Sequence, residues 1–201
     1  MPSLWADSLD EHRALVLDRL LNAYEDVRKD VGVDGVTLAA VTRQAGLARS
    51  AVYNYVGDKH GLILAHAERV MGRAVARLRT AVAQAPTPED KLVAYVRLTL
   101  QLQNSETGAG DDLMSLLTPE EQQQLMAMLA PIRKVLEELV VEGVSVGVFD
   151  GDAQDLVAVV WATLGGFRMP VAAGHIAADH AAEIVSAVLL RGLTGGHVRG
   201  A

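Results

Sequence analysis

Cysteine is absent from the 201-residue chain, which excludes disulfides, thiolate metal sites and a cysteine nucleophile. Aromatic residues make up only 4% of a chain that is half hydrophobic, so we expect a core of aliphatic side chains. The N-terminal segment MPSLWADSLDEH has acidic residues where a secretory signal would need basic ones. The longest uncharged apolar run, residues 156–167, has 12 residues and is too short to cross a bilayer. We therefore expect a soluble, cytoplasmic protein that does not enter a membrane.

The motifs that mark enzymes are also missing. His175, His180 and Glu183, with the neighbouring Asp179, form the densest group of possible metal ligands, but their spacing matches neither HExxH nor paired ExxH motifs. The glycines before Asp111 lack the GKS or GKT ending of a phosphate-binding loop, and no serine stands in a GxSxG context. The sequence predicts no enzymatic activity, no cofactor and no metal site.

The net charge of -7 is distributed unevenly. Residues 1–35 have a balance of -4, residues 36–84 a balance of +5, and residues 85–201 a balance of -8. Acidic surroundings repel nucleic-acid phosphates everywhere except at the basic segment, which would orient the molecule on DNA. An exposed, solvated helix face is the alternative explanation for part of this charge, and we favour it for Arg73, Arg77 and Arg79.

Almost every segment has the periodicity of helix, because apolar residues recur at spacings of three and four. We expect an all-α fold, in which a three-helix DNA-binding domain of residues 1–57 is joined by a long helix to a helical domain of residues 58–201. Glycines in residues 31–35 should end the first helix, and Pro170 should follow the end of the last but one. The expected helices cover residues 9–29, 37–45, 48–55, 58–84, 89–104, 111–117, 119–129, 131–146, 153–169 and 177–193.

The most informative stretch is VTLAAVTRQAGLARSAVYNYVGDKHGLIL, residues 36–64. Thr37 can cap the first of two short helices, and Gly46 stands where the turn between them needs a positive φ. In the second short helix, one arc faces the core and consists of Ala48, Ala51, Val52 and Tyr55. The opposite arc faces outward and consists of Arg49, Ser50, Tyr53 and Asn54. Guanidinium, hydroxyl, phenol and carboxamide groups suit contacts to phosphates and to base edges in a major groove.

This stretch resembles the DNA-binding domain of the TetR family of transcriptional regulators. The matching residues are Thr37, Ala45-Gly46-Leu47, Val52-Tyr53, Tyr55, Lys59 and Leu62. The chain departs from the family pattern at Ala48, where Ser or Thr usually caps the recognition helix, and at Val56, where an aromatic residue is usual. The gap before Thr37 is also longer than is common.

The resemblance implies that Thr37, Lys59 and Tyr53 bind phosphates. From their chemistry, we expect Arg49 and Asn54 to read guanine and adenine edges, with Ser50 assisting either kind of contact. Arg43, on the outer face of the first short helix, completes the predicted DNA-binding set. The alternative for each tyrosine is that it only packs the domain, and we favour that alternative for Tyr55.

The last two helices are apolar on nearly every face, so something must cover each of them on all sides. The resemblance implies that they form a four-helix bundle with a second copy of the chain, and a monomer with a large core is the alternative. The predicted dimer contacts are Leu156, Val160, Leu164, Ile184 and Val188. A dimer would present two recognition helices about one DNA turn apart to a pseudo-palindromic operator.

The resemblance also implies a ligand pocket among the middle helices, for a small apolar or aromatic effector that releases the protein from DNA. The candidate lining residues are Tyr95, Leu98, Leu102, Met114, Leu117, Met126, Met128, Trp161 and Phe167. Ordinary core packing is the alternative for each of them. We therefore expect an effector-released dimeric repressor. A DNA-binding regulator without an effector, and a helical enzyme or carrier, are the two alternatives.

Overall fold

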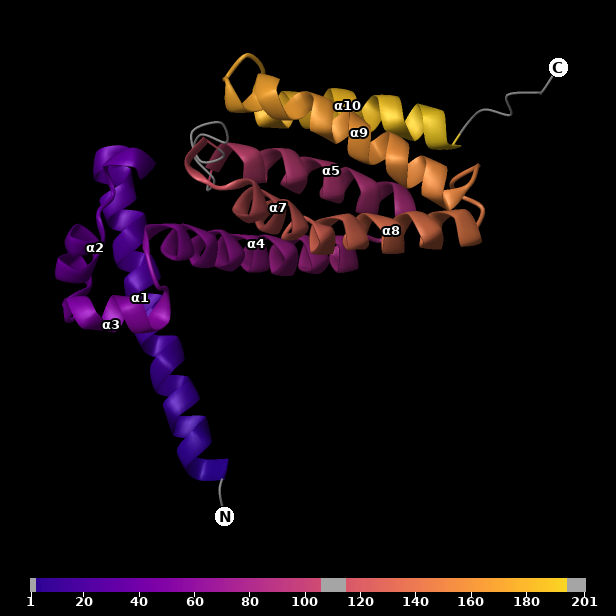
Figure 1. The fold of residues 1–201 in the computed structure, drawn as a ribbon. Coiled ribbons are helices and arrows are strands. Elements are labelled where there is room, and N and C mark those ends of the chain that lie inside the picture. Colours follow the sequence, from indigo (N-terminus) through magenta and orange to yellow (C-terminus); the bar gives the residue numbers. More distant parts are fainter. Residues whose placement is uncertain (1–2, 106–114, 195–201) are drawn as a thin grey trace. The chain divides into compact units, whose positions relative to one another are not determined.

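The computed structural model describes residues 3–105 and 115–194, and helix is the only regular secondary structure in that part of the chain (Figure 1). The expected all-α fold is confirmed. The helices are α1 (Ser3–Gly35), α2 (Leu38–Ala45), α3 (Arg49–Tyr55), α4 (Lys59–Gln84), α5 (Pro88–Ser105), α7 (Pro119–Ala127), α8 (Ala130–Ser145), α9 (Ala153–Ala172) and α10 (Ala178–Thr194).

Two helix ends differ from the sequence prediction. The first helix starts at Ser3 instead of residue 9, whereas its break at Gly32, whose φ is 71°, and its end at Gly35 agree with the glycines predicted to end it. The last but one helix includes Pro170. Pro170 has no N–H donor, but it lies in the last turn of α9, where the N–H of Ala173 still donates to the carbonyl of Met169 at 2.9 Å. The helix therefore continues past the proline to Ala172.

The chain divides into two compact units. The N-terminal unit consists of Met1–Arg69 and Asp111–Leu125, and the C-terminal unit of Val70–Gly110 and Met126–Ala201. This division lies later than the boundary predicted between residues 57 and 58. The physical reason is that Leu62 and Ile63, in the first turns of α4, are buried in the core of the N-terminal unit.

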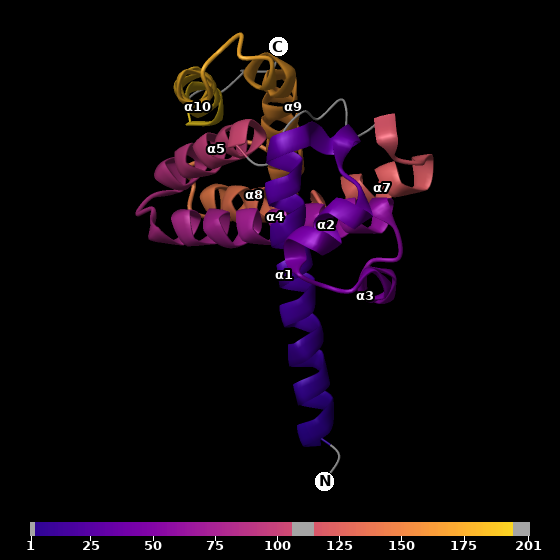
Figure 2. The same ribbon diagram turned by 90° about the vertical axis from the view of Figure 1, so that its left-hand side faces the viewer.

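The N-terminal unit is a three-helix arrangement to which the start of α4 is added. The helices α1, α2 and α3 contact one another, and α1 is the longest of them (Figures 1 and 2). Leu20 and Tyr24 of α1, Val41 of α2 and Val52 of α3 are fully buried together. Burial raises the pKa of Tyr24 above the ordinary value. This shared core fixes the two short helices on α1 and leaves their outer faces to solvent.

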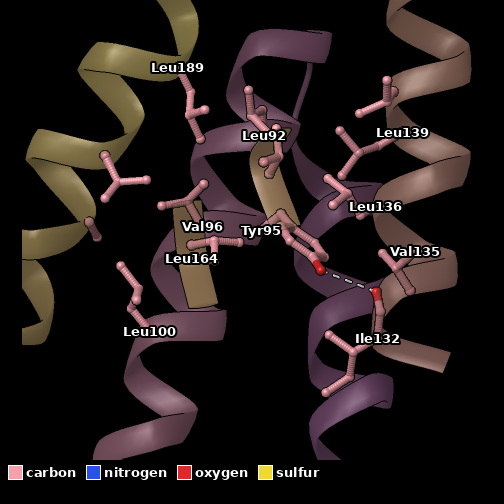
Figure 3. Packing of buried hydrophobic residues seen from close by; sticks show 14 of the residues in the cluster. Leu92, Tyr95, Val96, Leu100, Ile132, Val135, Leu136, Leu139, Leu164 and Leu189 are labelled. Carbon is pink, nitrogen blue, oxygen red and sulfur yellow. Dashed lines mark hydrogen bonds between the residues drawn. The ribbon is translucent and has the colours of Figure 1, made fainter. Parts of the chain in front are cut away.

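The core of the C-terminal unit is formed by α5, α8, α9 and α10 with the second half of α4. Tyr95 of α5 lies at its centre, among side chains of α5 and α8 that Figure 3 shows at close range. Its hydroxyl donates a hydrogen bond to the carbonyl oxygen of Ile132 at 3.3 Å, and burial raises the pKa of this phenol well above its ordinary range. The bond gives the buried hydroxyl an acceptor inside an otherwise aliphatic core.

The helix α9 is apolar along its length, although only part of it is buried. By length and composition alone, this 20-residue helix could cross a membrane, although no such span was expected from the sequence. Only 22% of its most apolar window is buried within the chain. Val157, Val160 and Leu164 belong to the core, whereas Val159 and Met169 are exposed. The helix thus has one face in the core of its own unit and a second apolar face in solvent.

Candidate nucleic-acid interface

The helix α2 has the cap and the turn that the sequence predicts. The hydroxyl of Thr37 accepts a hydrogen bond from the backbone N–H of Ala40 at 3.2 Å, and Gly46 has a φ of 63°. Val41 is buried, while Thr37 and Arg43 are exposed. Arg43 therefore projects from the surface of the N-terminal unit, as the outer-face prediction requires.

The helix α3 presents its predicted polar arc to solvent as far as the structure describes it. Tyr53 is 55% exposed and Asn54 is exposed, while Val52 on the opposite face is fully buried. The side chains of Arg49 and Ser50 lie outside the described residues. The two described side chains therefore lie on an outer face that is open to solvent.

Two residues of the predicted inner arc differ in their degree of burial. Ala48 was expected to face the core, but it is exposed and forms the N-cap of α3, with no side-chain hydrogen bond to the helix. An alanine at this position leaves the first N–H groups without a side-chain acceptor. Tyr55 is half-buried, and the guanidinium of Arg13 lies 5.8 Å from the centre of its ring. A packing role for Tyr55 fits this contact.

The joint between α3 and α4, residues 56–61, is held by several hydrogen bonds. Gly57 has a φ of 75°, and the N–H of Asp58 donates to the carbonyl of Val56 at 2.9 Å. The carboxylate of Asp58 caps α4 by accepting the N–H of Gly61 at 2.8 Å. The ammonium of Lys59 donates to the carbonyl oxygen of Asp34 at 2.9 Å.

The Lys59–Asp34 bond brings two predicted phosphate ligands to one place. Asp34 lies three residues before Thr37, so the start of α4 meets the chain segment that leads into α2. An ammonium group has three donors, and the N-termini of both helices offer further N–H groups to an anion. The Lys59 contact thus links the starts of the two helices whose residues are predicted to bind phosphates.

Several residues that sequence reasoning did not select hold this surface in place. The guanidinium of Arg19 donates to the carbonyl of Ala45, the last residue of α2, at 3.1 Å. Arg69 of α4 donates to Asn22 of α1 at 2.7 Å and lies 3.3 Å from the carboxylate of Glu25. Asn22 and Glu25 are three residues apart and so share a face of α1, which is a spacing signal that could have indicated a cationic partner.

The predicted dimer contacts fall into two groups. Val160 and Leu164 are fully buried in the core of the C-terminal unit, so they cannot contribute surface to an interface, and their assignment is corrected. Leu156 is half-buried against the same core. Ile184 and Val188 of α10 are exposed, as a contact surface requires. The sequence did not distinguish the two faces because both are apolar.

The predicted pocket residues are not all in one place. Leu117 is buried in the core of the N-terminal unit, and Met126 is exposed, so neither fits a pocket inside the C-terminal unit. Met114 lies outside the described residues. Tyr95 is fully buried in the C-terminal core. The remaining candidates are half-buried, namely Leu98, Leu102, Met128, Trp161 and Phe167.

A charged group lies beside Trp161, one aromatic member of that set. The guanidinium of Arg133 lies 6.0 Å from the centre of the Trp161 ring, within cation–π range.

Within residues 3–105 and 115–194, no three histidine, aspartate or glutamate side chains are grouped as metal ligands.

Comparison with known proteins gives both sequence relatives and structural neighbours. No model of a known protein family matches the chain. The HTH-type transcriptional regulator BetI of Burkholderia thailandensis is 36% identical over 77 residues, which is 37% of this chain and 37% of that protein. The chain thus matches little more than a third of the length of that relative. The name agrees with the expectation of a transcriptional regulator rather than an enzyme.

Solved structures match over nearly the whole chain. A putative TetR-family transcriptional regulator from Rhodococcus sp. has a TM-score of 0.71 at 15% identity and covers 90% of this chain and 98% of its own. The transcriptional regulator FadR from Bacillus subtilis, solved in complex with stearoyl-CoA, has a TM-score of 0.66 at 18% identity and covers 89% of this chain and 98% of its own. At these identities the likeness establishes the fold.

Proposed function

We propose that this chain, which has the fold of TetR-family transcriptional regulators and a helix-turn-helix sequence like theirs, is a dimeric repressor that binds a pseudo-palindromic operator in the cytoplasm and is released by a small effector. The observation on which DNA binding depends most is the outer face of α3. That helix is the recognition helix of the proposal.

The chemistry of the N-terminal surface supports DNA as its partner. Tyr53 and Asn54 are exposed side by side on α3, and both have hydrogen-bonding groups that suit a groove. Thr37 and Lys59 lie at the starts of α2 and α4, where helix N–H groups also attract phosphate. We assign Asn54 and Arg49 to base readout, Thr37, Tyr53 and Lys59 to phosphates, and Arg43 and Ser50 to supporting contacts.

The second apolar face of α9 and α10 supports a homodimer. Val159, Ile184 and Val188 are exposed, and none of them has a polar side-chain group that could hydrogen-bond to water. Large exposed apolar surfaces on soluble proteins usually mark interaction sites. A symmetric pairing of these two helices with those of a second copy would cover them and would present two recognition helices to successive DNA turns.

The effector part of the proposal concerns the C-terminal unit. The half-buried Leu98, Trp161 and Phe167, together with the buried Tyr95, favour a mainly apolar or aromatic ligand. The similar FadR structure was solved in complex with stearoyl-CoA, which is consistent with ligand binding by a protein of this fold. Because α4 begins in one unit and ends in the other, an effector with unequal affinity for two positions of α4 would change DNA affinity.

The test is to select bound fragments from random genomic DNA with the full chain and to measure affinity for the recovered sequence. We expect a two-fold-related sequence bound at least about a thousandfold more tightly than random DNA. Absence of any enriched sequence would refute the proposal and favour the enzyme or carrier alternative. A regulator without an effector would bind the operator with an affinity that no compound in a library of apolar and aromatic ligands changes.

A further inference from the structure

The segment from Ser115 to Leu125 follows the helices of the C-terminal unit in sequence, yet it belongs to the N-terminal unit. Leu117 is 5% exposed within the N-terminal core cluster, and Leu125 packs against the same cluster. The side-chain amide of Gln122 donates to the carbonyl of Leu117 at 3.0 Å and fixes the start of α7 on this anchor. A distant part of the chain is therefore built into the unit that we propose to bind DNA.

Glu121 makes polar contacts both within this segment and with His60 of α4. One carboxylate oxygen accepts the backbone N–H of Thr118 at 2.8 Å, and the hydroxyl of Thr118 accepts the N–H of Glu121 at 3.3 Å, which together form a capping box at the start of α7. The other carboxylate oxygen lies 3.1 Å from Nδ1 of His60. The N–H of Thr118 is the main reason that the pKa of Glu121 is lowered, so its carboxylate is ionised at neutral pH.

His60 lies in the first turn of α4, within the α3–α4 joint. Its neighbours in the first turn of α4 are Lys59, which bonds to the carbonyl of Asp34, and Gly61, against which the carbonyl of Val56 packs. A contact that restrains His60 therefore restrains the first turn of α4, and this turn packs against the end of α3. Both partners of the contact are partly shielded from solvent, with side-chain exposures of 39% for His60 and 22% for Glu121.

We propose that Glu121 is a positioning residue for DNA binding, which holds the first turn of α4 through His60 and thereby keeps α3 in the orientation that binds DNA. The inference rests on the proposed function. It assigns to the 115–125 segment a role in the DNA-binding unit itself. Glu121 acts through His60 and the α3–α4 joint without touching DNA.

The experiment compares full-length variants for affinity toward the operator recovered from genomic DNA, measured by fluorescence anisotropy. We expect Glu121→Ala to weaken operator binding about three- to tenfold. Thr118→Ala is the matched control, because it removes the other half of the same capping box and leaves the His60 contact in place. Glu120→Ala removes a neighbouring exposed acid of the same turn. Both controls should bind as the unchanged protein does.

A double-mutant cycle separates positioning from a general loss of structure. His60→Ala should weaken binding as much as Glu121→Ala does, and the double variant no more than either one. His60→Asn should restore binding, because its amide nitrogen lies close to the position of Nδ1 and can still donate to Glu121. A merely structural contribution would lower thermal stability in step with affinity and would affect Thr118→Ala equally.

The outcomes distinguish this inference from the function on which it rests. If the unchanged protein binds a specific operator and Glu121→Ala binds it equally well, the positioning role is wrong and the proposed function stands. If additive losses appear in the double variant, the two residues act separately and the inference fails. If the unchanged protein binds no specific sequence, the proposed function fails and takes this inference with it.

Discussion

The Cα atom of Gly61 lies against the backbone carbonyl of Val56, so closely that a Cβ atom at position 61 would overlap the carbonyl oxygen. The carbonyl carbon of Val56 would lie 3.1 Å from the same Cβ atom. Backbone atoms cannot move aside as the end of a flexible side chain can. The end of α3 and the start of α4 therefore fit together only with glycine at this position.

Gly61→Ala should lower the free energy of unfolding by about 1–3 kcal/mol, because the overlap forces the α3–α4 joint apart. Operator binding should fall as well, since α3 loses its orientation. Gly72→Ala is the control in the same helix, where an added Cβ meets nothing within 4 Å. There the substitution should stabilise the helix by about 0.5–1 kcal/mol. Urea unfolding of both variants checks the prediction, and equal stabilities would contradict it.

Asn54→Ala and Tyr53→Phe should weaken DNA binding in different ways. Loss of the Asn54 carboxamide should cost about 1–3 kcal/mol on the preferred operator and relax the preference at one base pair, because we propose that this amide reads an adenine edge. Loss of the Tyr53 hydroxyl should weaken binding on every sequence alike, because a phosphate contact has no sequence information. Binding to a set of single-base operator variants distinguishes the two patterns.

Tyr55→Phe is the matched control for Tyr53→Phe, since it removes the same hydroxyl from the half-buried side of α3. It should leave operator affinity unchanged. If Tyr53→Phe also left operator affinity unchanged, the Tyr53 hydroxyl would have no contact with DNA.

The helices and the outward face of α3 could be predicted because local rules decide them. Thr37 and Gly46 have cap and turn chemistry that depends on neighbouring residues alone, and the structure has the bond and the φ that this chemistry requires. Tyr53 and Asn54 were placed by the helical period. Their exposure needed no knowledge of the rest of the chain.

Long-range packing decided what the sequence could not show. Val160 of α9 and Val188 of α10 are equivalent by sequence, because each lies in an apolar helix. Val160 is nevertheless buried in the core and Val188 is exposed, and only packing against neighbouring helices determines which of the two is buried. Leu117 lies 55 residues after Leu62 but shares a core with it. The His60–Glu121 contact joins residues 61 positions apart, and the capping box that contains Glu121 does not indicate a contact with His60.

Ser186→Ala should stabilise the C-terminal unit. The hydroxyl of Ser186 is buried in the core on α10 and has no hydrogen-bond partner among the described residues. A buried hydroxyl without a partner costs about 1 kcal/mol or more, which the substitution should recover. Ser145→Ala is the control, because that exposed hydroxyl already donates to the carbonyl of Glu142 at 2.7 Å. Calorimetry should show a melting temperature about 2–4 °C higher for the first variant only. A lower value would show that the hydroxyl is used.

Val188→Lys should convert the proposed dimer into a monomer. Val188 is 62% exposed on α10 within one chain, and pairing with a second copy would bury the new ammonium against apolar side chains, which costs several kcal/mol without a partner charge. The monomer should remain folded, because the lysine reaches solvent when the partner is absent. It should also lose most of its operator affinity, since each half-site would then be bound alone.

Val141→Lys is the control for this change, since Val141 is similarly exposed, at 55%, but lies on α8. Sedimentation velocity over a range of concentrations gives the oligomeric state of both variants, and circular dichroism shows whether each is folded. We expect a monomer for Val188→Lys and a dimer for Val141→Lys. A dimer that survives Val188→Lys would place the interface elsewhere, and dissociation by both substitutions would mean that α8 also contributes to it.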